Sequence, residues 1–208
     1  MNIRLTRAYC AGMISLGLMS AANAVPLPLE SRLGGLAYYD PNLVITWLAD
    51  ANAGAGSPFD DASSPTDGEM RWASANSWAA SLTIGGVSGW RLPSANVNGD
   101  STVVDCAGGG VAGCADNEMG YLYWEEGITA AAPGPFSNVQ GDNYWSGTDA
   151  PDPSEAWVLF FNDGLQGVDS KTEHSSFAWA VRSGDVPEPS TWLLVAVGLA
   201  AAHRRRWA

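Results

Sequence analysis

Tryptophan and amide side chains lie close together in this chain, in a combination that proteins use to bind sugars. An exposed indole ring stacks on the apolar face of a pyranose, while nearby amides and carboxylates bind its hydroxyl groups. Asn143, Tyr144 and Trp145 lie in a glycine-rich stretch, and we predict that they form a ligand-binding surface with Trp145 exposed. Core packing is the alternative role of any tryptophan. The sequence pattern favours it at four positions: Trp72, Trp78, Trp157 and Trp179.

A second group of oxygen donors lies in the stretch ANVNGDSTVVDC, with the spacing of the first ligands in a calcium loop. The group consists of Asn96, Asn98, Asp100 and Asp105. A loop of the EF-hand type also needs glycine at its sixth position and an acidic residue at its twelfth, where this chain has Ser101 and Ala107. Two interpretations stay open: a calcium site, or a surface turn in which Asn and Asp side chains bind the neighbouring backbone.

The cysteines predict a disulfide and not a metal centre. Cys10 lies in an N-terminal segment that we expect to be removed, which leaves Cys106 and Cys114 in an oxidising compartment. The intervening sequence AGGGVAG is flexible enough to close the loop. Two cysteines without histidines make a poor metal site, and His174 is the only histidine between Val25 and Asp185.

Groups that could form an active site are few. The sequence GVSG at residues 86–89 is one residue short of a nucleophile elbow. His174 is surrounded by polar residues, as expected of an exposed loop histidine. Glu125 and Glu126 would point about 100° apart on a helix, which does not place a carboxylate pair across one glycosidic bond. We therefore predict that the chain is not an enzyme.

The N-terminus has the three parts of a secretory signal peptide. A positively charged start is followed by an apolar run over residues 8–19 and by the small-residue cleavage pattern Ala22-Asn23-Ala24. The run is shorter than the roughly 20 residues that a membrane span needs. We predict that residues 1–24 are removed on export, and we disfavour a core helix or an anchor.

Residues 25–185 form the expected folded domain, which is strongly acidic. The span contains 21 acidic and five basic residues, so its net charge is −16. Such a surface repels nucleic acid and anionic polymers. Nucleic acid is therefore excluded as a partner, while neutral glycans, cations and basic proteins remain. Alternatively, the acidity only keeps an exported protein soluble.

Turn residues are dense in this domain, so strands and loops should dominate. We expect strands over residues 43–47, 157–161, 165–169 and 177–182, with a hairpin turn at Asn162-Asp163-Gly164. One helix should cover residues 68–82 behind an Asp67 cap. A shorter helix should run from Asp116 or Asn117 to about Glu125. A long loop should extend from Ala53 to Pro65.

Five sequence blocks between Leu43 and Asp185 occur in a recognisable order. They are LVITWLADAN, WAASLTIGGVSGWRLPS, CADNEMGYLYW, GPFSNVQGDNYWSGT and FAWAVRSGD. In this order the chain resembles the Lcl C-terminal domain family, and its WRLP block is also similar to formylglycine-generating and C-type-lectin-like proteins. The resemblance implies an α+β fold: a C-type-lectin-like domain with small twisted antiparallel sheets, two short helices and long loops.

The family resemblance also implies adhesion or surface binding. The family is named after an adhesin whose C-terminal domain is associated with sulfated polysaccharide. Sulfate groups have little to bind on a domain with a charge of −16. We therefore carry over surface binding as a class of function and not the sulfated ligand.

The C-terminus resembles the PEP-CTERM sorting signal of Gram-negative bacteria. Pro187, Glu188 and Pro189 are followed by an apolar segment over residues 192–202 and then by three arginines. The resemblance implies cleavage near these three residues by an exosortase, a membrane-embedded cysteine transpeptidase. The arginines should stay in the cytoplasm, so the apolar segment would hold the chain transiently in the inner membrane. Residues 186–208 therefore form the expected sorting region.

Together these patterns predict an exported, non-catalytic surface or matrix protein. After sorting, it would leave the inner membrane and associate with extracellular polysaccharide at the cell surface or outside the cell. Calcium remains an optional cofactor. Two alternatives stay open: a hydrolase that acts on the polysaccharide, and a purely structural matrix protein without a specific ligand.

Overall fold

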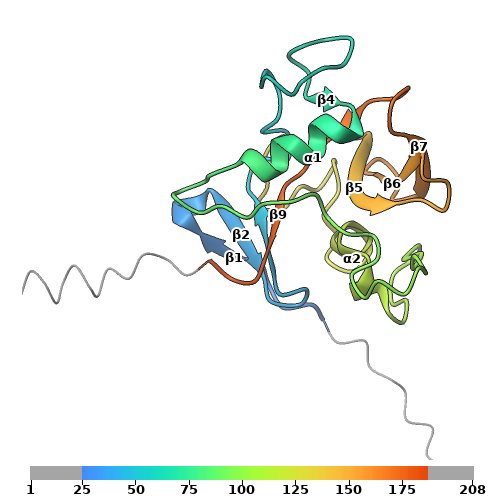
Figure 1. The fold of residues 1–208 in the computed structure, drawn as a ribbon. Coiled ribbons are helices and arrows are strands. Elements are labelled where there is room, and N and C mark those ends of the chain that lie inside the picture. The colour runs from blue at the N-terminus through green and yellow to red at the C-terminus, as the bar shows by residue number, and fades with distance from the viewer. Residues whose placement is uncertain (1–24, 187–208) are drawn as a thin grey trace, which may run out of the picture.

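The computed structural model describes residues 25–186, and its first sheet contains both ends of this range. Four antiparallel strands lie in the order β1 (Glu30–Arg32), β2 (Ala37–Asp40), β3 (Ile45–Leu48) and β9 (Val181–Ser183) (Figure 1). All four residues of β3 are buried, which explains why its sequence is almost continuously apolar. The predicted strand at 43–47 therefore exists but begins two residues later, after a positive φ at Val44.

The second sheet has five strands and is mixed. Its order is β4 (Glu69–Met70), β8 (Ser176–Phe177), β5 (Asn143–Asp149), β6 (Glu155–Phe160) and β7 (Gln166–Ser170). β5 and β8 pair in parallel, so the expectation of purely antiparallel sheets is wrong at this pair. The hairpin of β6 and β7 confirms the predicted one, and Gly164 in its turn has a φ of 76°. A side chain there would also collide with Tyr123, 2.3 Å from the position of a Cβ atom.

The segment predicted as one last strand crosses between the two sheets. Phe177 ends β8 in the second sheet, and Val181 begins β9 in the first. The intervening residues Ala178, Trp179 and Ala180 are buried. An apolar run fits a strand and a buried crossing equally well, which is why the sequence could not separate them.

Two helices frame the sheets, as predicted. α1 (Trp72–Ser81) runs from the first sheet towards β5, and α2 (Glu118–Trp124) lies below the second sheet in the view of Figure 1. Asn117 caps α2, because its Oδ1 accepts a hydrogen bond of 3.0 Å from the backbone N–H of Gly120. The predicted Asp67 cap of α1 is wrong. Asp67 instead binds the N–H of Glu69, and β4 intervenes before the helix begins.

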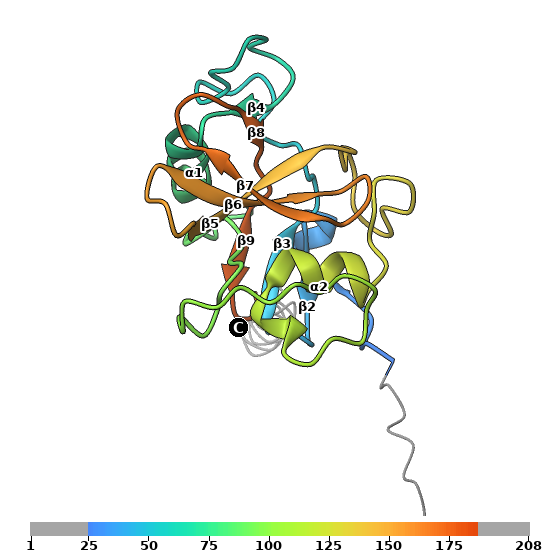
Figure 2. The same ribbon diagram turned by 90° about the vertical axis from the view of Figure 1, so that its right-hand side faces the viewer.

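Aromatic rings fill the space between the sheets. Trp47 and Trp179 have ring centroids 5.2 Å apart, and Phe136 meets Trp179 edge-on at 4.8 Å. Tyr144 and Phe161 extend this cluster towards the second sheet, which crosses the upper half of Figure 2. The fold is thus α+β with two small sheets around one core. Short 3₁₀ turns at Leu33–Gly35 (η1) and Cys114–Asp116 (η2) complete the elements.

Long connections make up the rest of residues 25–186. The predicted loop at residues 53–65 contains no helix or strand and projects at the top in both ribbon views (Figures 1 and 2). Within this range no helix is long and apolar enough to cross a membrane. The predicted signal peptide, and the apolar segment at residues 192–202, lie outside the described residues.

Candidate functional site

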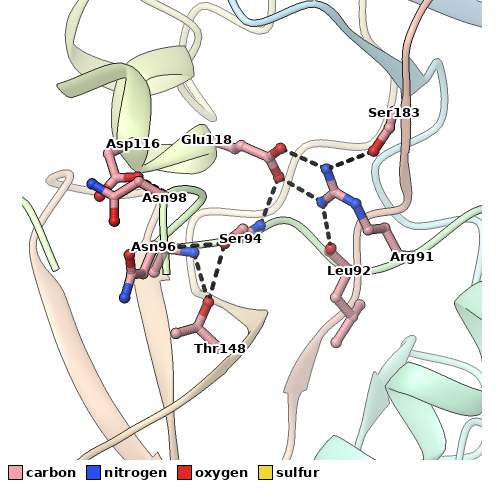
Figure 3. A network of polar contacts seen from close by, with 10 residues as sticks. Arg91, Leu92, Ser94, Asn96, Asn98, Asp116, Glu118, Thr148 and Ser183 are labelled. Atoms are coloured by element: carbon pink, nitrogen blue, oxygen red, sulfur yellow. Dashed lines mark hydrogen bonds and ion pairs between the residues drawn. The ribbon is translucent and has the colours of Figure 1, made fainter. Parts of the chain in front are cut away.

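The WRLPS block, residues 90–94, runs between the two sheets and carries an ion pair to α2. The backbone of Arg91 forms two hydrogen bonds of 2.8 Å with the backbone of Val181. This single antiparallel bridge attaches the block to β9. The guanidinium of Arg91 reaches Glu118, the first residue of α2, through two bonds of 2.7 Å (Figure 3). This fork-to-fork geometry is the strongest kind of arginine–carboxylate contact.

Glu118 is fixed from a third direction as well. The backbone N–H of Ser94 donates to its Oε2 at 2.6 Å, and only 2% of the side chain is exposed. The carboxylate also lies in the first turn of α2, where the helix dipole favours a negative charge. The Arg91 side chain is 37% exposed, so the carboxylate of this ion pair is buried whereas the arginine side chain reaches solvent. The carboxylate of Glu118 therefore balances the charge of Arg91 within the protein itself.

Thr148 of β5 ties the end of the WRLPS block to the second sheet. Its Oγ1 accepts a hydrogen bond of 2.9 Å from the N–H of Ala95 and lies 3.4 Å from Oγ of Ser94 (Figure 3). The N–H of Gly147 donates to the carbonyl of Pro93 at 2.7 Å. These contacts hold the loop and the strand together at the surface.

Two surface hollows adjoin at Thr148, and we call them together the Thr148 groove. The first, of about 510 Å³, is lined by Asn76, Arg91, Leu92, Pro93, Ser94, Val97, Gly147, Thr148 and Ser183. The second, of about 350 Å³, is lined by Asn96, Ser101, Val103, Thr148, Asp149, Ala150, Pro151 and Trp157. Each hollow is lined by hydroxyl and amide groups, and the second is also lined by the indole of Trp157.

The structure overturns the predicted exposure of Trp145. Its indole is fully buried and donates a hydrogen bond of 2.8 Å to the carbonyl of Met70. Tyr144 is also fully buried, and only Asn143 is partly accessible. β5 lies between two other strands and under α1, so its aromatic side chains have no path to solvent. The expected binding surface at residues 143–145 is therefore part of the core.

Trp157 departs from its prediction in the opposite direction. Its pattern favoured core packing, but the side chain is only half-buried and lies outside the hydrophobic core cluster. In contrast, Trp78 and Trp179 are buried, and Trp72 packs against the core with its Nε1 bonded to the carbonyl of Ser146. The predicted roles of these three are thus confirmed.

The oxygen-rich loop at residues 96–105 binds its own backbone. Oδ1 of Asn96 accepts from Gly99, Oδ1 of Asn98 from Asp100, and Oδ1 of Asp100 from Thr102, all N–H groups. Oδ1 of Asp105 accepts from the N–H of Ala107, away from the other three. Residues 25–186 contain no cluster of three or more His, Cys, Asp or Glu suited to a metal ion. The contacts are those of a chain of Asx turns.

Cys106 and Cys114 form the predicted disulfide, with their Cα atoms 5.4 Å apart. The bond closes the glycine-rich loop directly ahead of η2 and α2, and both sulfurs are buried. It therefore anchors the segment that leads to Glu118.

His174 is the residue nearest to a catalytic arrangement. Its Nδ1 pairs with Asp169, which raises the pKa of the imidazole, first through the hydrogen bond and then through the charge of the carboxylate. No serine hydroxyl or thiol within residues 25–186 is hydrogen-bonded to this ring. The pair is a surface contact of the loop after β7.

Among the polar residues of the Thr148 groove, the sequence indicates only Asn96, and there as a candidate calcium ligand. Asn76 belongs to a predicted helix, and Ser94 and Thr148 lie in sequence blocks that assign them no role. The spacing of these residues carries no signal, since they come together through the pairing of loop and strand. A partial signal was the WRLPS block itself, in which a charged residue stands between two apolar ones.

Comparison with protein families assigns two regions of the chain. The model of the Lcl C-terminal domain matches residues 37–182. The chain belongs to the Lcl C-terminal domain family. A second model, the PEP-CTERM protein-sorting motif, matches residues 185–206, which include Pro187, Glu188 and Pro189 outside the described residues. No curated protein and no solved structure matches the chain.

The two matches confirm the resemblances to the Lcl C-terminal domain and to the PEP-CTERM signal, while the C-type-lectin-like resemblance stays a prediction. The Lcl C-terminal domain covers every strand from β2 to β8, both helices and the lining of the Thr148 groove except Ser183. The sorting motif begins three residues after this domain ends, so no further domain separates them. The motif marks the chain as an exported protein that an exosortase sorts.

Proposed function

We propose that this Lcl C-terminal domain protein is a non-catalytic component of the cell surface or extracellular matrix, which associates with extracellular polysaccharide after exosortase sorting. The observation that carries the proposal is the direct succession of one disulfide-bonded domain and a PEP-CTERM motif. A chain sorted in this way presents its single domain to the space where the polysaccharide lies. Binding or retention there is then the task of that domain.

The side chains of the domain support a non-catalytic role. Glu118 is bound by Arg91 and Ser94 beside the groove, and no carboxylate lines the first hollow. Asp149 in the second hollow is bound by Nζ of Lys171 at 2.6 Å. A glycosidase needs two carboxyl groups across one bond, about 5 to 9.5 Å apart. Neither hollow contains such a pair among its lining residues.

Cell fractionation of the full chain tests the proposal. The protein is produced in a Gram-negative host that has an exosortase and makes extracellular polysaccharide. We expect it in the polysaccharide fraction, and we expect a variant with Pro187, Glu188 and Pro189 replaced by alanine to stay with the inner membrane. As a control, alanine at Ser190 and Thr191, directly after these three residues, should leave sorting unchanged.

Two results would contradict the proposal. One is a processed protein that is released freely and does not sediment with the polysaccharide. The other is the appearance of new reducing ends when the purified processed protein is incubated with that polysaccharide, which would favour the hydrolase alternative.

A further inference from the structure

Trp157 differs from the other seven tryptophans of residues 25–186 in having no internal role. Six of the others belong to the core cluster or pack against it: Trp47, Trp72, Trp78, Trp90, Trp145 and Trp179. Trp124 donates its Nε1 to the carbonyl of Gly164 and packs on Tyr123. The indole of Trp157 makes no hydrogen bond and no ring contact within the described residues, and it is half-buried. Since the exposed part of this large aromatic ring gains nothing for folding, its place at the surface needs another explanation.

The surroundings of Trp157 combine apolar and hydroxyl-rich surface. In the β6–β7 ladder it stands directly opposite Val168, whose side chain is 43% exposed. On its other side lies the second hollow of the Thr148 groove, with the amide of Asn96 and the hydroxyl groups of Ser101 and Thr148. A pyranose presents the same two kinds of surface: an apolar ring face and a rim of hydroxyl groups.

The two hollows of the groove, of about 510 and 350 Å³, share Thr148 and together offer room for more than one sugar unit. Thr148 lines both hollows, and the first continues towards Asn76 on α1 and Ser183 on β9. These two residues add an amide and a further hydroxyl to the polar lining. The two hollows together measure several hundred Å³, the size that encloses a small ligand in protein sites.

The charges around the groove select against an anionic ligand. Arg91 is the only cation in its lining, and both ends of its guanidinium are bound by Glu118. Around Trp157 the charged residues of the β5–β6 connection are acidic: Asp149, Asp152 and Glu155. Lys171 is held by Asp149 and by the carbonyl of Pro153, so it is not free to meet an anion. A sulfated or uronate chain would meet net repulsion here.

From this arrangement we infer that the Thr148 groove binds a short stretch of neutral polysaccharide, with one pyranose ring stacked on the indole of Trp157. The inference rests on the proposed function, and it adds the site and the chemical class of the ligand. Hydroxyl groups of the neighbouring sugar units contact Thr148, Asn96 and Ser101. In this inference the tryptophan that binds the sugar is Trp157, and not Trp145, which is buried.

Binding of neutral hexaoses to the processed protein tests this inference. The probes are cellohexaose, maltohexaose and mannohexaose, with sulfated cellohexaose as the anionic counterpart. We expect at least one neutral hexaose to bind and the sulfated probe to bind more weakly. Trp157→Ala should weaken binding by about tenfold or more, as loss of a central aromatic contact does elsewhere.

The matched control is Tyr39→Ala. Tyr39 is also a half-buried aromatic residue outside the core cluster, but it lies in β2 of the first sheet, under the guanidinium of Arg32. Its loss should leave hexaose affinity unchanged. A second measurement does not depend on any variant: the bound hexaose should protect Trp157 of the unaltered protein from oxidation by N-bromosuccinimide, mapped by peptide mass spectrometry.

The outcomes separate this inference from the proposed function. If the processed protein sediments with native polysaccharide but no hexaose protects Trp157, the groove is not the site and the inference is overturned. The same holds if Trp157→Ala binds as well as the unaltered protein. If Trp157-dependent binding is found although the protein does not reach the polysaccharide in cells, the inference stands and the proposed function fails.

Discussion

Asp40 and Glu126 are both bound by Asn42, and each carboxyl group has one buried oxygen that no donor in residues 25–186 reaches. Asp40 ends β2 and is fully buried, with Oδ1 bound by the N–H groups of Asn42 at 2.8 Å and Leu43 at 3.1 Å. Glu126 accepts a hydrogen bond of 2.9 Å from the amide of Asn42 through Oε1. The remaining oxygens, Oδ2 and Oε2, satisfy each other only when a proton lies between them.

This arrangement gives the protein a defined pH dependence. Burial, and then the charge of Asp40, raise the pKa of Glu126 to about 8. The pKa of Tyr121 is also raised, by burial and by the charges of Glu126, Asp40 and Glu125. Between about pH 4.5 and 8 the folded protein thus holds a proton on Glu126 that the unfolded chain releases. Stability must fall as the pH rises through this window, because the folded state binds more protons.

Glu126→Gln should remove most of this slope. The new amide can donate permanently to Oδ2 of Asp40 and still accept from Asn42, so it mimics the protonated acid. At pH 9 we expect a gain of about 1–3 kcal/mol in the free energy of unfolding. This range is smaller than the full pKa shift would give, because solvent reaches the side chain and screens its charge. Urea unfolding at pH 5, 7 and 9 measures it. These values lie above the range where Asp185 titrates, since the hydrogen bond from Arg32 outweighs burial and lowers its pKa.

Glu125→Gln is the control for this experiment. Glu125 is the neighbouring residue, but its Oε1 binds the backbone N–H of Gly110 in the glycine-rich loop and not a second acid. Its replacement should keep the slope between pH 5 and 9. Equal slopes in the two variants would show that Asp40 and Glu126 do not share a proton.

Arg91→Met should be among the most destabilising single changes at the surface. It leaves the carboxylate of Glu118 buried, with the N–H of Ser94 as its only remaining partner among the bonds seen here. We expect a loss of about 3–5 kcal/mol in urea unfolding, as for other broken buried ion pairs. The double variant Arg91→Met/Glu118→Met should be less destabilised than the single one. If the double variant is less stable than the single one, the buried charge of Glu118 is not the cause of the destabilisation.

The fold could be predicted where a local pattern decides it, and less well where two segments meet. The hairpin of β6 and β7, the Asn117 cap and the disulfide all depend on residues within 15 positions of each other. The crossing from β8 to β9 depends on two different sheets, which a single apolar run cannot indicate. The same limit explains the missed Thr148 groove, whose polar residues come from α1, β5 and β9 and from the loop after Arg91.

The sequence predicts an exposed Trp145 and a buried Trp157, whereas the structure buries Trp145 and leaves Trp157 partly exposed. Neighbouring glycine, asparagine and serine residues suggested a surface for Trp145, but β5 is the central strand of its sheet and buries it. Trp157 lies in a strongly apolar strand, yet its face of β6 is only partly buried and also carries Glu155 two positions earlier. Burial was set by what lies over each strand face, which the strand sequence does not contain.

The disulfide should stabilise the domain by about 2–3 kcal/mol, the amount expected for closing so short a loop in the unfolded chain. Cys106→Ser/Cys114→Ser should lower the free energy of unfolding by this amount and loosen the start of α2, because Asn117 binds the carbonyl of Val104, and these two residues flank the closed loop. Thiol labelling of the folded, exported protein should find no free cysteine. Two reactive thiols per chain would contradict the bond.

Processing at both ends can be checked by the mass of the protein itself. Cleavage after Ala24 and near Pro187-Glu188-Pro189 would leave a chain that begins at Val25 and ends by about Pro189. In the structure the new N-terminal segment is fixed: Asn42 binds both the N–H and the carbonyl of Leu27 at 2.9 Å, so the domain holds residues next to the first cut. Intact mass spectrometry on protein recovered from the cell surface should therefore give this species. Recovery of a chain that still contains Arg204 to Arg206 would show that the C-terminal segment is retained as an anchor.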